Sequence, residues 1–185
     1  MKQLFRQYKP FFVFLLKFFL FYGVLTFCYS LYLNQFDEHL FETDTFTIMV
    51  AEQSKSVLEF FGKSASVEPN ASEPCVNLIY QGKFIARIIE GCNAISVMIL
   101  FAAFVFAFST TWLRTISYIV IGCIIIHILN ILRIALLAMA LYSYPESEHL
   151  LHGVVFPLFI YAVVFVLWVF WLQKFSRNDA AASKK

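Results

Sequence analysis

Three residues of this 185-residue chain have side chains that together can carry out acyl transfer: Cys92, Arg133 and His152. A cysteine thiolate is a nucleophile, a histidine can accept and return a proton, and an arginine is a fixed cation that stabilises a thiolate or an oxyanion. The set is the one needed for acyl transfer through a thioester intermediate. No metal or other cofactor is required for this chemistry, and none is expected.

Two further side chains are predicted to orient this catalytic set by hydrogen bonds. Ser96 lies one helical turn beyond Cys92, and Asn130 lies one turn before Arg133. His127 precedes Asn130 by another turn, and this polar stripe is expected to face other helices.

Each candidate also has a simpler interpretation. A lone cysteine in an apolar segment is most often a small apolar side chain, and Cys28 and Cys123 are interpreted in this way. An arginine inside a membrane can act as a structural clamp, and a histidine can lie at the interface. His149 competes with His152 for the role of the base, and we favour His152 because Gly153 and an apolar run follow it.

The elements that position these residues are predicted to be membrane-spanning helices. Hydrophobic residues make up 61% of the chain and charged residues 14%, and mean hydropathy is +0.74. A spanning helix needs about 20 mostly apolar residues. Four segments are predicted to span: 11–33, 94–108, 116–142 and 154–172. The chain is therefore predicted to be one all-α integral membrane domain, residues 1–185, with a long outer loop at 34–91.

The charges predict the orientation of these spans. Of the 12 acidic residues, only Asp179 falls in an inner segment if the N-terminus is inside. The inner segments hold the basic residues Lys2, Arg6, Lys9, Arg114, Lys174, Arg177, Lys184 and Lys185. This positive-inside pattern predicts a multi-pass membrane protein with cytoplasmic termini. Cys92, Arg133 and His152 then share the extracytoplasmic side.

The outer loop is expected to associate with the membrane. Apolar residues recur at helical spacing from Thr45 to Phe61, Asp44 can cap the start, and Gly62 ends the pattern, which predicts an interfacial amphipathic helix. Residues 63–74 are expected to form an irregular connector.

A second element of the loop leads the chain to Cys92. Val76 to Tyr80 and Lys83 to Ile89 are apolar stretches on either side of Gln81-Gly82, a composition that suits a short β-hairpin. A helix interrupted by Gly82 is the alternative.

The chain resembles the exosortase and archaeosortase family, in particular its short exosortase F-like branch. The resemblance rests on Glu90-Gly91-Cys92-Asn93-Ala94-Ile95-Ser96, Asn130-Ile131-Leu132-Arg133-Ile134 and His152-Gly153. The order of Cys, Arg and His and their places at outer helix ends both match. Longer members follow the cysteine with a Ser-Gly pair and an Arg, where this chain has Asn93-Ala94-Ile95.

The resemblance implies a membrane cysteine transpeptidase or protease in which Cys92 attacks, Arg133 stabilises charge and His152 moves the proton. The implied partners are membrane-anchored proteins with a C-terminal hydrophobic helix and a basic tail, the lipid bilayer and optionally a small membrane accessory protein. Nucleic acid is not an expected partner, since the net charge is only +2.

Two other functions compete with this prediction. Four cysteines in a four-span protein also suit a thiol oxidoreductase, although that chemistry normally uses a Cys-x-x-Cys pair, and here Cys75 and Cys92 are far apart in sequence. A non-enzymatic assembly or transporter subunit is the other alternative, with Arg133 and His127 paired to a partner helix.

Overall fold

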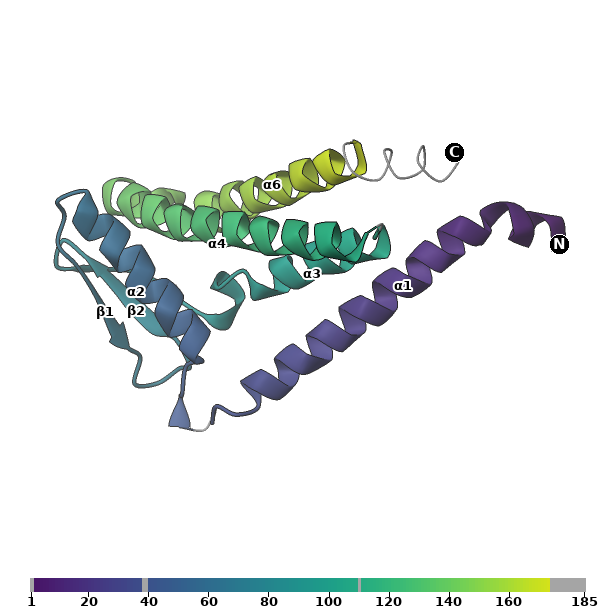
Figure 1. The fold of residues 1–185 in the computed structure, drawn as a ribbon. Coiled ribbons are helices and arrows are strands. Elements are labelled where there is room, and N and C mark those ends of the chain that lie inside the picture. Colours follow the sequence, from purple (N-terminus) through teal and green to yellow (C-terminus); the bar gives the residue numbers. More distant parts are fainter. Residues whose placement is uncertain (1, 38–39, 110, 174–185) are drawn as a thin grey trace.

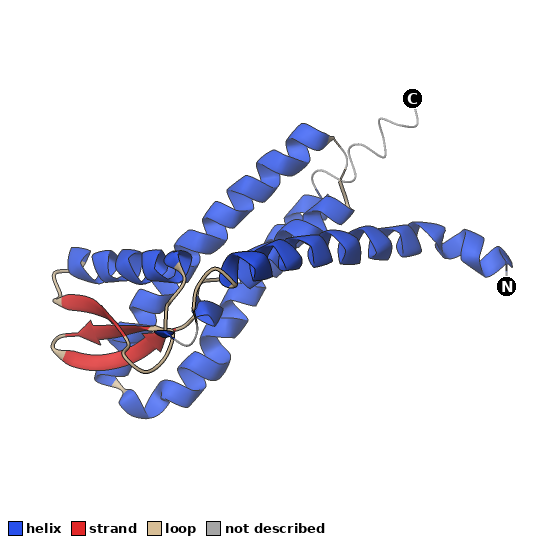
Figure 2. Ribbon diagram, turned by 90° about the horizontal axis from the view of Figure 1, so that it is seen from below, coloured by secondary structure: helices blue, strands red, loops and turns tan. Residues whose placement is uncertain are grey.

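The structure is a computed structural model that describes residues 2–37, 40–109 and 111–173. It is mostly helical, with one small β-sheet at one end of the helices (Figures 1 and 2). The basic C-terminal residues used to predict the orientation, from Lys174 onward, lie outside the described ranges.

Five helices form most of the fold: α1 (Lys2–Leu33), α2 (Thr45–Phe60), α3 (Ile95–Ala107), α4 (Trp112–Ser143) and α6 (Phe156–Trp171). Shorter helical segments are η2 (Glu90–Cys92), η3 (Pro145–Ser147), α5 (Glu148–Leu150) and η4 (Leu151–Val155), the last of which is a π-helix. α3, α4 and α6 pack against one another, and α1 packs along α3 (Figure 1).

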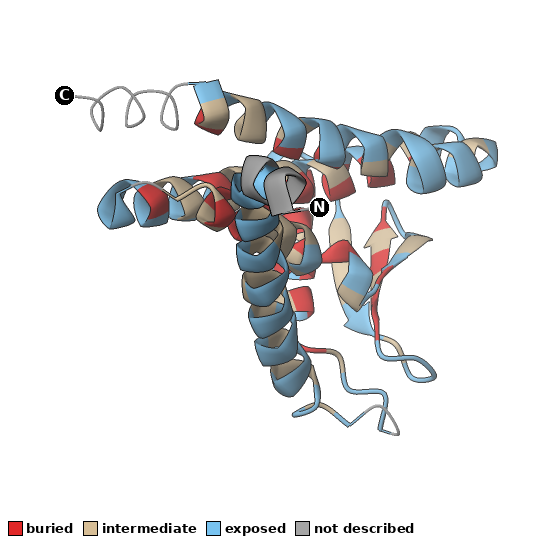
Figure 3. Cartoon of the chain, turned by 90° about the vertical axis from the view of Figure 1, so that its right-hand side faces the viewer, coloured by how far each residue is buried: buried red, intermediate tan, exposed pale blue. Residues whose placement is uncertain are grey.

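Three helical segments are long and apolar enough to cross a membrane: Tyr8–Leu33, Trp112–Ser143 and Pro145–Trp171. None of the residues in the most apolar window of the first segment is buried within the protein, and most of this helix is exposed (Figure 3). Its exposed residues include large apolar side chains such as Leu16, Phe19 and Phe27. Such a surface is stable in lipid and unfavourable in water. The chain is therefore an integral membrane protein.

The predicted span at 94–108 is the exception. The corresponding helix α3 is apolar but has only 13 residues. At about 1.5 Å per residue it is roughly 20 Å long, less than the hydrocarbon core of about 30 Å. Aromatic rings hold it to α1. Phe21 and Phe106 are stacked with centroids 4.0 Å apart, and Phe14 and Phe108 are tilted with centroids 4.3 Å apart.

The predicted outer loop contains a three-stranded antiparallel sheet with the order β1 (Ala65–Pro69), β2 (Val76–Tyr80), β3 (Lys83–Ile88). The hairpin interpretation therefore holds for β2 and β3. Gln81 and Gly82 form its two-residue turn, with φ of 54° and 72°, which matches the left-handed turn that fits the twist of the strands. The expectation of an irregular connector at 63–74 is wrong, because residues 65–69 pair with β2.

α2 begins where the sequence indicates, since the Asp44 carboxylate accepts a hydrogen bond from the Thr47 backbone N–H at 2.9 Å. Its buried residues Val50, Ala51 and Leu58 pack on the inner face of the sheet and on α4. Phe60 is 86% exposed at the end of the helix. The sheet and α2 thus form one layer, named the outer layer after the predicted outer loop. It packs on the C-terminal half of α4.

Candidate active site

Cys92 is the last residue of η2, the single turn that joins β3 to α3. Its side chain is buried, and two hydrogen bonds fix its backbone. The Cys92 N–H donates to the Ile89 carbonyl at 2.8 Å, and the Cys92 carbonyl accepts from the Asn130 amide Nδ2 at 2.8 Å. Asn130, which the sequence predicts to orient the catalytic set, thus contacts the backbone of Cys92.

The next residue, Asn93, connects this turn to three helices. Its Oδ1 accepts from the Ile95 N–H at 2.9 Å and so begins α3. Its Nδ2 donates to the Thr47 hydroxyl on α2 at 3.0 Å and to the Tyr29 hydroxyl on α1 at 3.1 Å. Tyr29 in turn donates to the Glu90 carboxylate at 2.6 Å. The turn that carries Cys92 is therefore fixed to α1, α2 and α3 through buried or half-buried hydrogen bonds.

The backbone after Asn93 adopts an unusual conformation. Ala94 has φ of 65° and ψ of 10°, in the left-handed region. A residue with a β-carbon loses about 1–2 kcal/mol there. The surrounding hydrogen bonds of Asn93 compensate for this strain and hold the sharp turn between Cys92 and α3.

Arg133 and His152 lie with Cys92 around one narrow cavity. The Arg133 side chain lies close enough to Cys92 to interact with it electrostatically, and both line the same cavity as His152, which comes from η4. The rest of the wall comes from β2, β3 and α4: Leu78, Ala86, Arg87, Ile88, Ile134, Leu137 and Ala138. The structure thus brings together the three residues that the sequence selected.

His152 reaches this cavity from η4, the π-helical segment Leu151–Val155. A π-bulge inserts an extra residue into a helical turn and is frequent at functional sites. His152 itself is exposed, in contrast to Cys92. His149 is also exposed and is not among the residues that line the cavity.

Two buried polar atoms beside Cys92 have no hydrogen-bond partner within the described chain: Asn130 Oδ1 and Arg133 Nε. Buried polar groups are nearly always paired in folded proteins. One of these atoms is an acceptor and the other is a donor.

The other predicted residues lie apart from the cavity. Ser96 is exposed in the first turn of α3 and does not line it. His127 shares a hydrogen bond of 2.9 Å with Gln53 of α2, so it joins α4 to the outer layer. His127 therefore faces another helix, as expected, whereas Asn130 faces the turn that carries Cys92 and Arg133 lines the cavity.

All four cysteines, each within the described ranges, are free thiols. Cys75 is fully buried next to β2. Burial raises the pKa of the Cys75 thiol, the Glu73 carboxylate raises it further, and Arg87 partly opposes both. A protonated, buried thiol is a poor participant in disulfide exchange.

Sequence reasoning missed the Asn93 network, in which Thr47 and Tyr29 are the key partners. A polar side chain next to the proposed nucleophile was the available signal for Asn93. No pattern in the sequence indicates that a tyrosine of the first span meets it.

Comparison with known families gives one match. A family model described as transmembrane exosortase matches residues 6–176, nearly the whole chain. No curated protein and no solved structure matches this chain significantly.

Proposed function

Because the chain belongs to the transmembrane exosortase family, we propose that it is a membrane-embedded cysteine transpeptidase or protease that cleaves C-terminal sorting signals of exported proteins. The observation that carries this proposal is the single cavity lined by Cys92, Arg133 and His152. A peptide group as the ligand is supported by two unpaired buried atoms, the acceptor Asn130 Oδ1 and the donor Arg133 Nε, because a peptide group offers one N–H and one C=O.

In the proposed mechanism, His152 takes the proton of the Cys92 thiol and the sulfur attacks the carbonyl carbon of the scissile bond. Arg133 first stabilises the thiolate and then the oxyanion of the tetrahedral intermediate. When this intermediate collapses, the C–N bond breaks and His152 returns the proton to the leaving amine. The substrate remains attached to Cys92 as a thioester until water or an amine releases it.

We further propose four membrane crossings, with α3 and its flanking residues as the second of them. The charge distribution then places both termini in the cytoplasm and Cys92 on the outer side of the bacterial inner membrane. A substrate anchored by its own C-terminal hydrophobic helix diffuses in the same membrane and presents its cleavage site at that surface. Its basic tail stays inside, so recognition takes place outside the membrane or between helices.

A comparison of membrane-protein C-termini by mass spectrometry tests this proposal. Cells that carry Cys92→Ala should accumulate uncleaved proteins that end in a hydrophobic helix and a basic tail, whereas wild-type cells contain the shortened forms. Cys28→Ala is the matched control, because Cys28 is exposed on α1 and is not among the residues lining the cavity. Identical C-termini in the wild-type and Cys92→Ala cells would rule out the enzyme.

A further inference from the structure

The cavity at Cys92 continues into a groove along the surface of the outer layer. A cavity of about 430 Å³ adjoins it and shares His152 with it, and one of about 360 Å³ follows. Ala86 and Arg87 of β3 line all three cavities, and Leu141 and Glu148 line the two outer ones. One side of the groove is therefore a single strand, β3.

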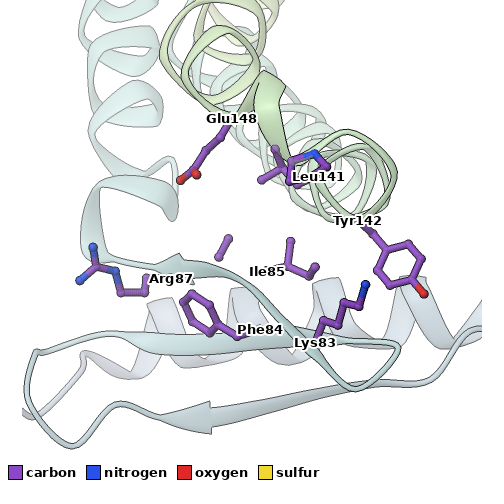
Figure 4. A pocket seen from close by; sticks show the side chains of 9 residues that line it. Lys83, Phe84, Ile85, Arg87, Leu141, Tyr142 and Glu148 are labelled. Atoms are coloured by element: carbon purple, nitrogen blue, oxygen red, sulfur yellow. The ribbon is translucent and has the colours of Figure 1, made fainter.

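β3 is an edge strand, since the order in the sheet is β1-β2-β3. The backbone N–H and C=O groups on one side of an edge strand have no strand to pair with. Among the described residues, no hydrogen bond from another element reaches the backbone of residues 83–88. Figure 4 shows this strand facing Leu141, Tyr142 and Glu148 across the groove.

The charged residues of β3 contact other parts of the protein, and the contact of Lys83 crosses the groove. The Lys83 ammonium lies over the Tyr142 ring, 5.1 Å from its centroid. Arg87 forms an ion pair with Glu73. Both cations thus have partners within the protein. The opposite edge strand, β1, ends at Pro69, which lacks a backbone donor.

β3 also runs toward the proposed nucleophile. It ends at Ile88, and Cys92 follows four residues later. Six residues of strand extend about 20 Å at roughly 3.3 Å per residue. A peptide paired along β3 would therefore occupy about six residues in extended conformation and reach the cavity that contains Cys92.

We infer that the substrate binds by strand addition: the extended segment next to its cleavage site pairs with β3 as a fourth strand and leads the scissile bond to Cys92. This inference rests on the proposed peptidase function. Backbone hydrogen bonds supply affinity that depends little on sequence, and every second side chain enters the groove. The substrate class is thus an extended peptide recognised at alternate positions.

Disulfide trapping in proteoliposomes tests this inference. The enzyme carries Cys92→Ala, which retains uncleaved substrate, and Phe84→Cys, at a groove residue that is 60% exposed. The probe is a protein whose cleavage was found to depend on Cys92, with single cysteines placed in turn at eight positions before its cleavage site and copper phenanthroline as oxidant. Adduct should peak at the position opposite Phe84 and extend at lower yield to the positions two residues on either side, and these should exceed the intervening positions at least about threefold, because side chains alternate along a strand.

Glu68→Cys in the same Cys92→Ala background is the matched control, because it places an exposed thiol on β1, the other edge of the sheet. It should give only the background of the Cys92→Ala enzyme without an added cysteine. Equal adduct at Phe84→Cys and Glu68→Cys, or no alternation at Phe84→Cys, would overturn strand addition. Because the probe is chosen for Cys92-dependent cleavage, this result would leave the peptidase function intact, whereas absence of any such protein would refute the function itself.

Discussion

The two halves of the site are held in different ways. The turn that carries Cys92 is buried and is bonded to α1, α2 and α4 through Asn93 and Asn130. His152 is exposed on a π-helical segment. In the described part of the chain, no side-chain hydrogen bond holds residues 145–155 to another element.

The two halves therefore have different roles: the bonded half positions the nucleophile, and the exposed half admits the peptide. A nucleophile must be held within a fraction of an ångström of its attack position, and the bonded turn provides that precision. The cavity at Cys92 is narrow, so a peptide needs an adjacent segment that can move aside. Substitutions in the two halves should therefore separate catalysis from stability.

The largest loss of cleavage rate is expected from a substitution in the exposed half. His152→Ala should lower the cleavage rate roughly 10²–10⁴-fold, the usual contribution of a general base. The thermal melting temperature should not change, because His152 is exposed and forms no described hydrogen bond. His149→Ala, three residues away and outside the cavity, should cleave at the wild-type rate. Loss of activity in His149→Ala and not in His152→Ala would show that His149, and not His152, is the general base.

Arg133 should give the next largest effect. Arg133→Met removes the cation beside Cys92 and keeps an apolar side chain of similar length, so the cleavage rate should fall roughly 10²–10³-fold. Arg133→Lys restores the charge without the planar geometry and should recover part of this loss. Equal rates for the methionine and lysine variants would show that charge is not the important property of Arg133.

Asn130→Ala should reduce stability and rate together, because it removes the bond to the Cys92 carbonyl from the bonded half. The free energy of unfolding should fall by about 1–3 kcal/mol, the cost of leaving a buried polar group unpaired. Ser96→Ala is the control, since Ser96 is exposed and lies outside the cavity. Melting curves and cleavage rates of the two variants check this, and a normal rate in Asn130→Ala would contradict the positioning role.

The smallest effect concerns the strain at Ala94. Ala94→Gly should stabilise the protein by up to about 1 kcal/mol, because glycine adopts a positive φ without the β-carbon penalty. Ala102→Gly, the same change in the middle of α3, should destabilise by about 1 kcal/mol. The same sign of shift in both melting temperatures would show that Ala94 is not strained.

The sequence predicts the parts of the molecule that depend on local chemistry. Long apolar blocks indicate α4 and α6 to within a few residues and the end of α1 at Leu33, whereas α1 begins at Lys2, well before the predicted residue 11. The carboxylate of Asp44 marks the start of α2, and Gln81-Gly82 marks the hairpin turn. The sequence also shows the order of Cys92, Arg133 and His152 and their positions near the ends of apolar segments.

The remaining parts depend on contacts between distant residues. β1 has a short, weakly alternating sequence ending in Pro69, and it becomes a strand only because β2 lies beside it. The left-handed turn at Ala94 depends on the bonds of Asn93 to Tyr29 and Thr47, which are 64 and 46 residues away in sequence. The bounds of α3, by contrast, agree with the apolar block 94–108 to within one residue at each end.

The most direct test of the account is chemical capture of the thioester at Cys92. Hydroxylamine attacks a thioester carbonyl, which releases the Cys92 thiol and leaves a hydroxamate on the carboxyl end of the cleaved substrate. Wild-type enzyme in proteoliposomes with hydroxylamine should yield substrate ending in a hydroxamate, identified by mass spectrometry, and Cys92→Ala should yield none. Cleavage that persists in Cys92→Ala, or wild-type cleavage that never produces the hydroxamate, would contradict a cysteine-dependent acyl transfer.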